Sequence, residues 1–271
     1  MEILATHSRF SSRKQTIARH FGNAYDYDQH AHIQQQACRA LLANIAHDKQ
    51  DSVLEIGAGT GQMTRLLAAY IQSQHWLINE LCTEQTATLQ LILPTAQIAI
   101  GDAETLDFEG AHSLIISANA VQWFDNPLSF VSQSAPRLKV GGQLLFSTFT
   151  ANNFLQIKTL TGQGLTYPDN DKWQLALDST GFENIELSVQ RFDLLFATPY
   201  AVLKHMKLTG VSTNRTQTQT QSANSQPFIW TKARLQQFER DYWQHFSATD
   251  EEGHACVSLT YEVLIVSAFR P

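Results

Sequence analysis

The stretch VLEIGAGTG, from Val53 to Gly61, places an apolar run directly before three glycines at alternate positions. Such a run indicates a strand that ends in a tight turn, because glycine reaches backbone angles that other residues avoid. The next residues, QMTRLLAAYIQ, have apolar side chains at helical spacing. A strand, a glycine turn and a helix in this order are typical of a parallel sheet that binds a ligand at the turn.

The same alternation of apolar strand and amphipathic helix continues through the first half of the chain. Further strands are predicted for HWLINEL, AQIAIGDAE, HSLIISANAVQWF and QLLFSTF. Helices are predicted for TEQTATLQLIL, which stops at Pro94, and for PLSFVSQSAPRLKVGG, which is closed by Gly141 and Gly142. Strands that are apolar along their whole length are buried on both faces. The sequence therefore predicts an α/β fold with a doubly wound, mostly parallel sheet.

The pattern changes after Thr150. Helices are predicted for NDKWQLALDSTGF, PYAVLKHMKLTGV and TKARLQQFERDYWQHF, and strands for NIELSVQRFDLLF and VSLTYEVLIVSAF. Residues 12–46 are also predicted to be helical. The polar segment STNRTQTQTQSANSQ is expected to be a flexible surface loop, and a lid ordered by a ligand is the alternative.

Composition excludes several classes of protein. The net charge of −6 argues against a general nucleic-acid binder. No apolar run approaches the roughly 20 residues that cross a bilayer, and the N-terminus lacks a signal-peptide pattern. The cysteines Cys38, Cys82 and Cys256 lie far apart, which indicates free thiols rather than disulfides or a metal site. We expect a cytoplasmic protein that binds neither membrane nor metal.

Charge is unevenly distributed along the chain. Between Asp51 and Asp125 the only Lys or Arg is Arg65, against nine Asp or Glu residues. From Leu194 to Phe238 there is no carboxylate, whereas the same stretch contains the basic residues Lys204, Lys207, Arg215, Lys232 and Arg234. The N-terminal arm is also basic. An acidic first half with basic flanks suits a cationic ligand in the first half and an acidic partner at the flanks.

The spacing of the glycines discriminates between nucleotide-like ligands. A dinucleotide fingerprint is GxGxxG, but position 62 is Gln and the turn is GxGxG. Glu55, just before the turn, also fits poorly beside a pyrophosphate. A nicotinamide dehydrogenase is therefore disfavoured, and a glycine turn that only packs the strand against the helix is the structural alternative.

The ExGxGxG stretch resembles the first motif of class I S-adenosylmethionine (SAM) methyltransferases. Glu80, Asp102 and the SANAVQW stretch follow in the order and spacing of that family. The resemblance implies a Rossmann-like, seven-stranded sheet in which Glu80 binds the ribose hydroxyls and Asp102 reads the adenine amino group. The SAM-binding residues that it implies are Gln34, Glu55, Gly57, Ala58, Gly59, Gly61, Glu80, Leu81, Gly101, Asp102, Ala103, Glu104, Asn119, Ala120 and Val121.

The flanks resemble a narrower family, the malonyl-acyl-carrier-protein O-methyltransferases of biotin synthesis. The resemblance is carried by ARHFGNAYDYDQHAHIQQQA, in which Phe21, Gly22, Ala24, Tyr27, Asp28, Ala31 and Gln34 match the family pattern. NAVQW, LLFSTF, MKLTGVSTNR and LTYEVLIVSAF are also similar to that family. Departures are the Gln/Thr-rich loop and KLTG, where a Lys-x-Ile-Gly pattern is commoner.

This resemblance implies methyl transfer from SAM to the free carboxylate of malonyl-acyl carrier protein, or of malonyl-coenzyme A. The methyl ester would enter fatty-acid elongation toward pimeloyl and biotin. A carboxylate is ionised at pH 7, so the reaction needs positioning rather than a general base. We predict Tyr27 as a positioning hydroxyl and lid, and Lys207 as a cation that steers the carboxylate. The predicted substrate-binding residues are Trp123, Phe124, Phe149, Phe154 and Lys204.

A single domain is expected, divided into an N-terminal helical lid (1–36), a SAM-binding core (37–150), a cap with a helical insertion (151–246, including the loop 212–228) and the final strand (247–271). The basic flanks would dock the acidic carrier protein. Two other functions stay open. One is a class I methyltransferase acting on a free small molecule, and the other is a SAM-binding protein without catalysis.

Overall fold

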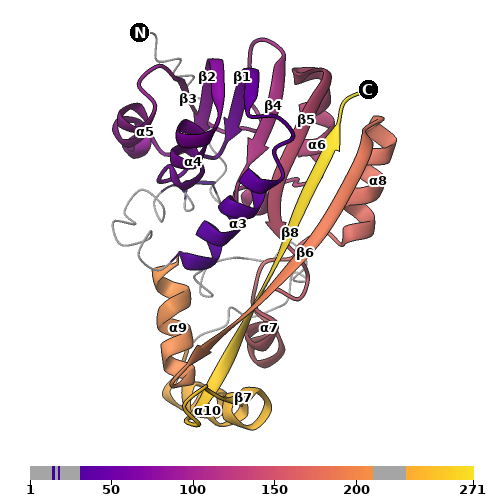
Figure 1. Cartoon of the computed structure of the whole chain (residues 1–271). Helices are drawn as coiled ribbons and strands as arrows, with labels where there is room; N and C mark the ends of the chain where they lie inside the picture. The colour runs from indigo at the N-terminus through magenta and orange to yellow at the C-terminus, as the bar shows by residue number, and fades with distance from the viewer. Residues whose placement is uncertain (1–13, 16–17, 19–30, 210–229) are drawn as a thin grey trace.

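The computed structural model describes residues 14, 15, 18, 31–209 and 230–271. Seven strands of this described part form one sheet in the order β3-β2-β1-β4-β5-β8-β6, and a short eighth strand, β7, pairs with β8 (Figure 1). The strands are β1 (Lys49–Ile56), β2 (Gln72–Glu80), β3 (Gln97–Ile100), β4 (His112–Ser117), β5 (Leu138–Phe149), β6 (Glu183–Phe196), β7 (Ser247–Thr249) and β8 (Ala255–Phe269). The predicted α/β fold with a mostly parallel sheet is confirmed.

The first five strands run parallel, and β8 pairs antiparallel with both β5 and β6. The register aligns Glu55 of β1 with Ile78 of β2 and with Ile116 of β4. Because parallel strands in register end at the same edge, the turns after β1, β2, β3 and β4 all lie together at the carboxyl edge of the sheet.

Helices cover both faces of the sheet (Figure 1). Alternate strand residues face opposite cores: Val53 belongs to one apolar cluster, and its neighbour Leu54 to the other. The first face carries α3 (His32–Ala43), α4 (Gln62–Tyr70) and α5 (Thr86–Ile92). The second carries α6 (Ser129–Ser134) and α8 (Asn170–Thr180).

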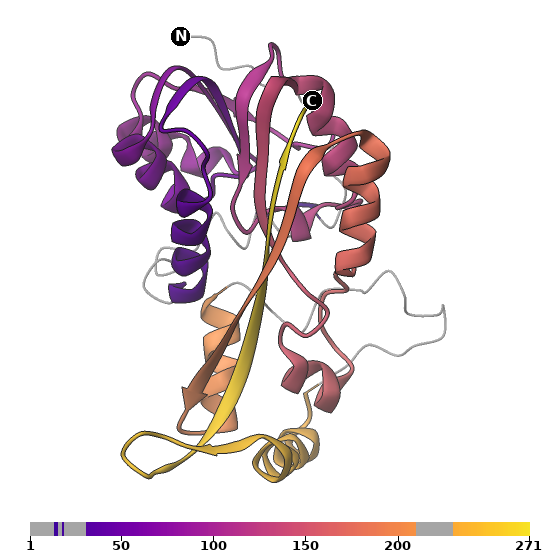
Figure 2. The same cartoon turned by 45° about the vertical axis from the view of Figure 1, so that its right-hand side comes forward.

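The long strands β6 and β8 continue beyond the parallel half as a twisted ribbon (Figure 2). Three helices pack around the far part of this ribbon: α7 (Leu155–Thr161), α9 (Pro199–Leu208) and α10 (Lys232–Phe246). Phe238 and Tyr242 are the buried residues of α10. The ribbon and these helices lie beyond the carboxyl edge of the parallel strands, on the side where the turns gather (Figure 1). None of the described helices is both long and apolar enough to cross a bilayer.

One predicted helix differs from the structure, and one observed helix was not predicted. The helix predicted up to Gly142 ends early: α6 stops at Ser134, a 3₁₀ turn covers Ala135–Arg137, and β5 already begins at Leu138. The C-terminal strand draws this segment into the sheet, because the Gly141 N–H donates to the carbonyl of Arg270 (2.7 Å). The helix α7 was not predicted. In the predicted helix 12–46, the continuous helix within the described part is α3.

Candidate cofactor and acceptor site

A pocket opens at the carboxyl edge of the parallel strands. It encloses about 1000 Å³, including the part that opens to solvent. Most of the predicted cofactor residues line it: Gln34, Glu55, Gly57, Ala58, Gly59, Glu80, Leu81, Gly101, Asp102, Ala103, Asn119 and Ala120. These residues come from α3 and from the ends of β1, β2, β3 and β4, so the parallel register is what brings them together.

The glycine turn is shaped by close approach at Gly57. Gly57 has a φ of +69°, and a Cβ atom added there would lie 2.4 Å from the Cβ atom of Ala120. No other residue type fits without displacing the turn that follows β4. Gly61, the N-cap of α4, does not line the pocket. A Cβ atom added at Gly61 would point toward α5 and lie 2.4 Å from the Cδ1 atom of Ile92.

Glu80, the last residue of β2, is held in one orientation by backbone amides. Its Oε2 atom accepts a hydrogen bond from the Gly59 N–H (2.7 Å), and its Oε1 atom accepts one from the Cys82 N–H (2.8 Å). Burial raises the pKa of Glu80, and these hydrogen bonds oppose that shift. Each carboxylate oxygen has a second lone pair available for a ligand. This arrangement fits a residue that accepts hydrogen bonds from a pair of hydroxyl groups.

Glu55, at the end of β1, is a buried carboxyl group in the same pocket. Its Oε2 atom has no hydrogen-bond partner. Burial raises the pKa of Glu55 to about 8, and the nearby carboxylate of Glu80 acts in the same direction. A buried carboxyl group with one oxygen free of hydrogen bonds is suited to a positively charged ligand. SAM carries an ammonium and a sulfonium group, so the residues of this pocket fit SAM.

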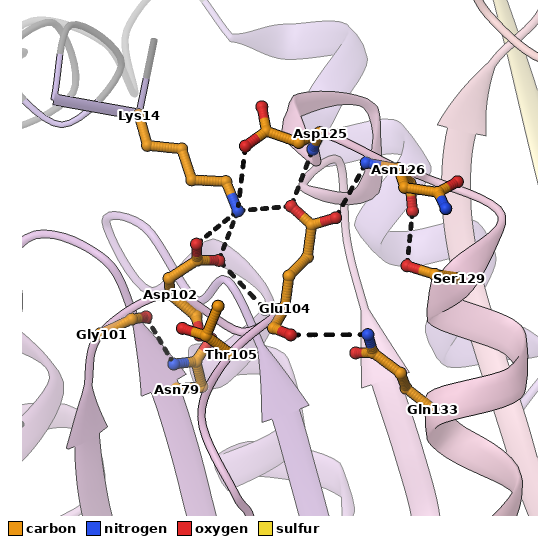
Figure 3. A network of polar contacts seen from close by, with 10 residues as sticks. All are labelled: Lys14, Asn79, Gly101, Asp102, Glu104, Thr105, Asp125, Asn126, Ser129 and Gln133. Carbon is orange, nitrogen blue, oxygen red and sulfur yellow. Dashed lines mark hydrogen bonds and ion pairs between the residues drawn. The ribbon is translucent and has the colours of Figure 1, made fainter. Parts of the chain in front are cut away.

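A buried lysine joins the N-terminal segment to the edge of the pocket (Figure 3). Lys14 Nζ lies 2.5 Å from both carboxylate oxygens of Asp102 and also pairs with Glu104, while Asp125 lies at 3.8 Å. The Lys14 side chain is 5% exposed. Glu104 also accepts hydrogen bonds from the backbone N–H groups of Asp125 (2.7 Å) and Asn126 (2.8 Å). Asp102 therefore faces the pocket with a fixed charge partner, whereas Glu104 ties the loops around it together.

A second cavity adjoins the first and encloses about 360 Å³, again including the part that opens to solvent. The two share Gln34, Asn119 and Trp123. The other residues that line the second cavity are Gln122, Phe149, Phe154, Leu165, Tyr167, Thr209 and Tyr261. We call it the acceptor cavity, because a molecule within it would lie beside the part of the cofactor pocket formed after β4.

The backbone is in the left-handed region at two residues of the acceptor cavity. Asn119 has a φ of 53° and Phe154 a φ of 56°. Asparagine tolerates this region, but phenylalanine rarely adopts it. Phe154 is held there by its N–H, which donates to the carbonyl of Thr260 (2.8 Å), and by edge contact with the Tyr261 ring, 4.6 Å between centroids. Strain of this kind is often found where a cavity must keep a defined shape.

The predicted catalytic and substrate-binding residues divide into three groups. Trp123, Phe149 and Phe154 line the acceptor cavity, and Phe124 lines the cofactor pocket. Lys204 and Lys207 are exposed on α9 and line neither cavity. Tyr27 and the loop 212–228 lie outside the described residues. Of the predicted cofactor residues, Gly61, Glu104 and Val121 do not line the pocket.

Several residues of the two cavities were not predicted. In the cofactor pocket they are Lys14, Cys38, Thr60, Gln62, Met63, Asn79, Cys82, Gln85 and Ala118, and in the acceptor cavity Gln122, Leu165, Tyr167, Thr209 and Tyr261. Tyr261 lies in the middle of an apolar strand pattern that predicts core packing. Lys14 is one of several basic residues of the N-terminal arm. Nothing in the local sequence distinguishes either of them. Within the described ranges, His, Cys, Asp and Glu side chains form no cluster of three that could hold a metal ion.

Comparison with known proteins identifies the family. A methyltransferase domain family matches residues 30–187, more than half of the chain. The malonyl-acyl-carrier-protein O-methyltransferase of Haemophilus ducreyi is 37% identical over 269 residues, which cover 95% of this chain and 97% of the relative. The chain belongs to this family of O-methyltransferases. The enzyme of the same name from Haemophilus influenzae is 36% identical to this methyltransferase, over 90% of this chain and 89% of the relative.

Solved structures agree with the fold of this methyltransferase. The phosphoethanolamine N-methyltransferase 2 of Haemonchus contortus, in complex with S-adenosyl-L-methionine, has a TM-score of 0.57 at 15% identity and covers 97% of this chain and 60% of its own. The N-methyltransferase NodS of Bradyrhizobium japonicum, in complex with S-adenosyl-l-homocysteine, has a TM-score of 0.53 at 11% identity, over 96% of this chain and 100% of its own. At these identities the likeness concerns the fold alone.

Proposed function

We propose that this methyltransferase transfers the methyl group of SAM to the free carboxylate of malonyl-acyl carrier protein. The product is the methyl ester of the malonyl thioester, a starter for fatty-acid elongation toward pimeloyl chains and biotin. The observation that carries the proposal is the chemistry of the acceptor cavity, which adjoins the cofactor pocket and is lined by aromatic rings and neutral polar groups. The relatives named for this reaction cover nearly the whole chain.

The acceptor cavity favours an acceptor that is already ionised. Among its described lining residues there is no Asp, Glu, His, Lys or Arg. A phenol or a carbon acid would need a base close to the methyl group, whereas a carboxylate with a pKa near 4 needs none. One carboxylate oxygen forms the new bond to the methyl carbon, and the electron pair of the broken carbon–sulfur bond stays on sulfur. No proton moves in this step.

The residues of the site then act by binding, orienting and excluding water. In this proposal Glu80 holds the ribose of SAM, Asp102, which is paired with Lys14, holds the adenine, and Glu55 neutralises a positive charge of the cofactor. Phe149, Phe154 and Trp123 exclude water from the attacking carboxylate, which makes that oxygen more reactive. Orientation of two reactants in this way contributes on the order of 7–11 kcal/mol to lowering a barrier.

The carrier protein would dock beside α9. Lys204 and Lys207 are one helical turn apart and exposed, and Lys232 at the start of α10 is exposed as well. Acyl carrier proteins are strongly acidic, so a basic surface raises the rate of encounter and orients the partner. Lys207 is assigned here to docking and steering from the protein surface, because α9 does not bring it into the acceptor cavity.

Incubation with methyl-labelled SAM and malonyl-acyl carrier protein tests the proposal. We expect the acyl group to gain the mass of one methyl and to lose it on mild ester hydrolysis. Malonyl-coenzyme A in a parallel reaction measures the contribution of the carrier. If SAM binds but no malonyl thioester is methylated, the proposed substrate is wrong. The two remaining possibilities, a free small-molecule acceptor and a non-catalytic role, would then be separated by a screen of carboxylate and phenol acceptors.

A further inference from the structure

Tyr261 is a polar residue in the wall of the acceptor cavity that the sequence pattern does not distinguish from core. It lies in the middle of β8 and its side chain is completely buried, yet it lines the cavity together with Phe149 and Phe154. The edge contact with Phe154 and a tilted contact with Phe149 fix the plane of its ring. With the ring fixed, the hydroxyl group has one defined position.

His205 holds the hydroxyl of Tyr261 from behind. The distance from His205 Nε2 to the Tyr261 hydroxyl oxygen is 2.8 Å, although the two residues are 56 positions apart. His205 comes from α9, whose start is set by Pro199 in the first turn and by the Thr198 hydroxyl, which accepts from the Ala201 N–H (3.2 Å). The His205 ring packs against Phe196 of β6, 5.1 Å between centroids. His205 does not line the acceptor cavity, so it can act there only through Tyr261.

The hydroxyl group of Tyr261 can donate a hydrogen bond into the acceptor cavity. A tyrosine hydroxyl donates one hydrogen bond and accepts others. When His205 Nε2 carries a hydrogen and donates it to the tyrosine oxygen, the tyrosine hydrogen is left for the cavity. Burial raises the pKa of Tyr261, which keeps the hydroxyl protonated and neutral. The Thr209 hydroxyl also lies beside the Tyr261 hydroxyl, where it lowers the tyrosine pKa, and it donates to the carbonyl of His205 (3.0 Å). Its oxygen can accept the tyrosine hydrogen in the ligand-free cavity, and a carboxylate, which is the stronger acceptor, would take its place.

We propose that Tyr261, oriented by His205, donates the hydrogen bond that positions the carboxylate of the acceptor. This inference rests on the proposed function, for which it names the group that binds the reacting carboxylate. Tyr261 touches the substrate in this scheme, and His205 is a positioning residue. A neutral donor suits the reaction, because it binds one carboxylate oxygen without cancelling the negative charge that the other oxygen needs for attack. A lysine at the same place would reduce that charge.

The decisive variant is Tyr261→Phe, and binding is its primary readout. The affinity of the enzyme–S-adenosylhomocysteine complex for malonyl-coenzyme A is measured by calorimetry. Loss of a hydrogen bond to a charged group should weaken this affinity roughly 10- to 100-fold. The affinity for acetyl-coenzyme A, which has no free carboxylate, should not change. The affinity for S-adenosylhomocysteine should also stay constant, which reports that the variant is folded.

Tyr242→Phe is the matched control. Tyr242 is also completely buried and loses one hydrogen bond on substitution, the 2.9 Å bond from its hydroxyl to the carbonyl of Ser258. It lines neither cavity. A purely structural effect of losing a buried hydroxyl would therefore appear in Tyr242→Phe as well. We expect this control to bind malonyl-coenzyme A like the wild type.

Substitutions of His205 test the positioning role. His205→Gln keeps a donor at about the reach of Nε2, and it should retain most of the affinity for malonyl-coenzyme A. His205→Asn places its donor too close to the backbone and should approach Tyr261→Phe. If His205 acts through Tyr261, the double variant His205→Asn/Tyr261→Phe should be no weaker than Tyr261→Phe alone.

The outcomes separate this inference from the proposed function. If the wild type methylates malonyl thioesters and Tyr261→Phe binds malonyl-coenzyme A as the wild type does, the inference is wrong and the function stands. Equal weakening for malonyl- and acetyl-coenzyme A also overturns it, because the hydroxyl would then not contact the carboxylate. If the wild type methylates no malonyl thioester, the proposed function fails first.

Discussion

The backbone N–H of Gly59 donates a 2.7 Å hydrogen bond to Oε2 of Glu80, 21 residues further along the chain. This bond joins the glycine turn after β1 to the end of β2. It fixes the conformation of the glycine turn and the orientation of the Glu80 carboxylate at the same time. A cofactor that lies across the two strand ends therefore meets groups that are already in place, and its binding need not organise them.

Glu80→Gln should weaken the binding of SAM at least tenfold. The amide has one acceptor oxygen in place of two, so it cannot serve both the Gly59 and the Cys82 N–H groups and also bind the ribose. Titration calorimetry measures the change. Glu84→Gln, at an exposed position on the following 3₁₀ turn, is the control. Equal affinity in Glu80→Gln would mean that the cofactor does not contact this carboxylate.

Lys14→Met should destabilise the ligand-free protein substantially. The side chains of Lys14, Asp102 and Glu104 are 5%, 12% and 10% exposed, so removing the lysine leaves two nearly buried carboxylates without their cation. Breaking a buried ion pair costs roughly 3–5 kcal/mol. Lys139→Met is the matched control, since its pair with Asp51 is 42% and 76% exposed and should contribute about 0–1 kcal/mol. Chemical denaturation of both variants measures the difference, and similar losses would contradict the structural role of Lys14.

Glu55 should make the ligand-free protein less stable as the pH rises. Its pKa is about 8 in the folded protein against 4.5 for an unperturbed glutamate. The stabilising contribution of the protonated form is complete below pH 4.5 and is lost as the pH rises through about 8. Within that window it falls by at most about 1.4 kcal/mol per pH unit. The difference in free energy of unfolding between the wild type and Glu55→Gln, measured from pH 5 to 9, should show this slope.

SAM should reverse part of that pH dependence. A positively charged ligand beside Glu55 favours the ionised carboxylate and lowers its pKa. Binding at pH 7 should therefore release a proton from the wild type, and calorimetry in two buffers with different ionisation enthalpies detects the release. Glu55→Gln should release none from this position. A proton release that is the same in both proteins would assign it to another group.

Charge reversal on α9 tests the docking surface. Lys204→Glu/Lys207→Glu should raise the KM for malonyl-acyl carrier protein severalfold, because an acidic partner is then repelled, and the effect should weaken at high salt. The KM for malonyl-coenzyme A should change little. Lys172→Glu, on the exposed surface of α8, is the control for net charge. If both substrates are affected equally, the two lysines act on the acyl group or on the fold and not on the carrier.

The sequence by itself determined the α/β fold and most of the cofactor pocket. Strand and helix periods are local, and the parallel register then brings the residues that follow each strand to one edge. Glu55, Glu80, Asp102 and Asn119 were assigned to the cofactor from their resemblance to the motifs of class I methyltransferases, and the register explains why these four residues meet. Trp123, Phe149 and Phe154 were also predicted as cavity walls, because the reaction calls for an aromatic-lined pocket, and all three line the acceptor cavity.

Only the tertiary structure decided which other side chains complete the site. Lys14 reaches Asp102 across 88 residues, and His205 reaches Tyr261 across 56. The start of β5 likewise depends on the chain terminus, through the bond from Gly141 to Arg270. Each of these contacts joins residues that are far apart in the sequence, and hydrophobic periodicity, which is a local pattern, cannot predict such pairs. The contact between His205 and Tyr261 is set by how α9 packs against β6 and β8, and therefore the acceptor cavity is complete only when the C-terminal part of the chain has folded.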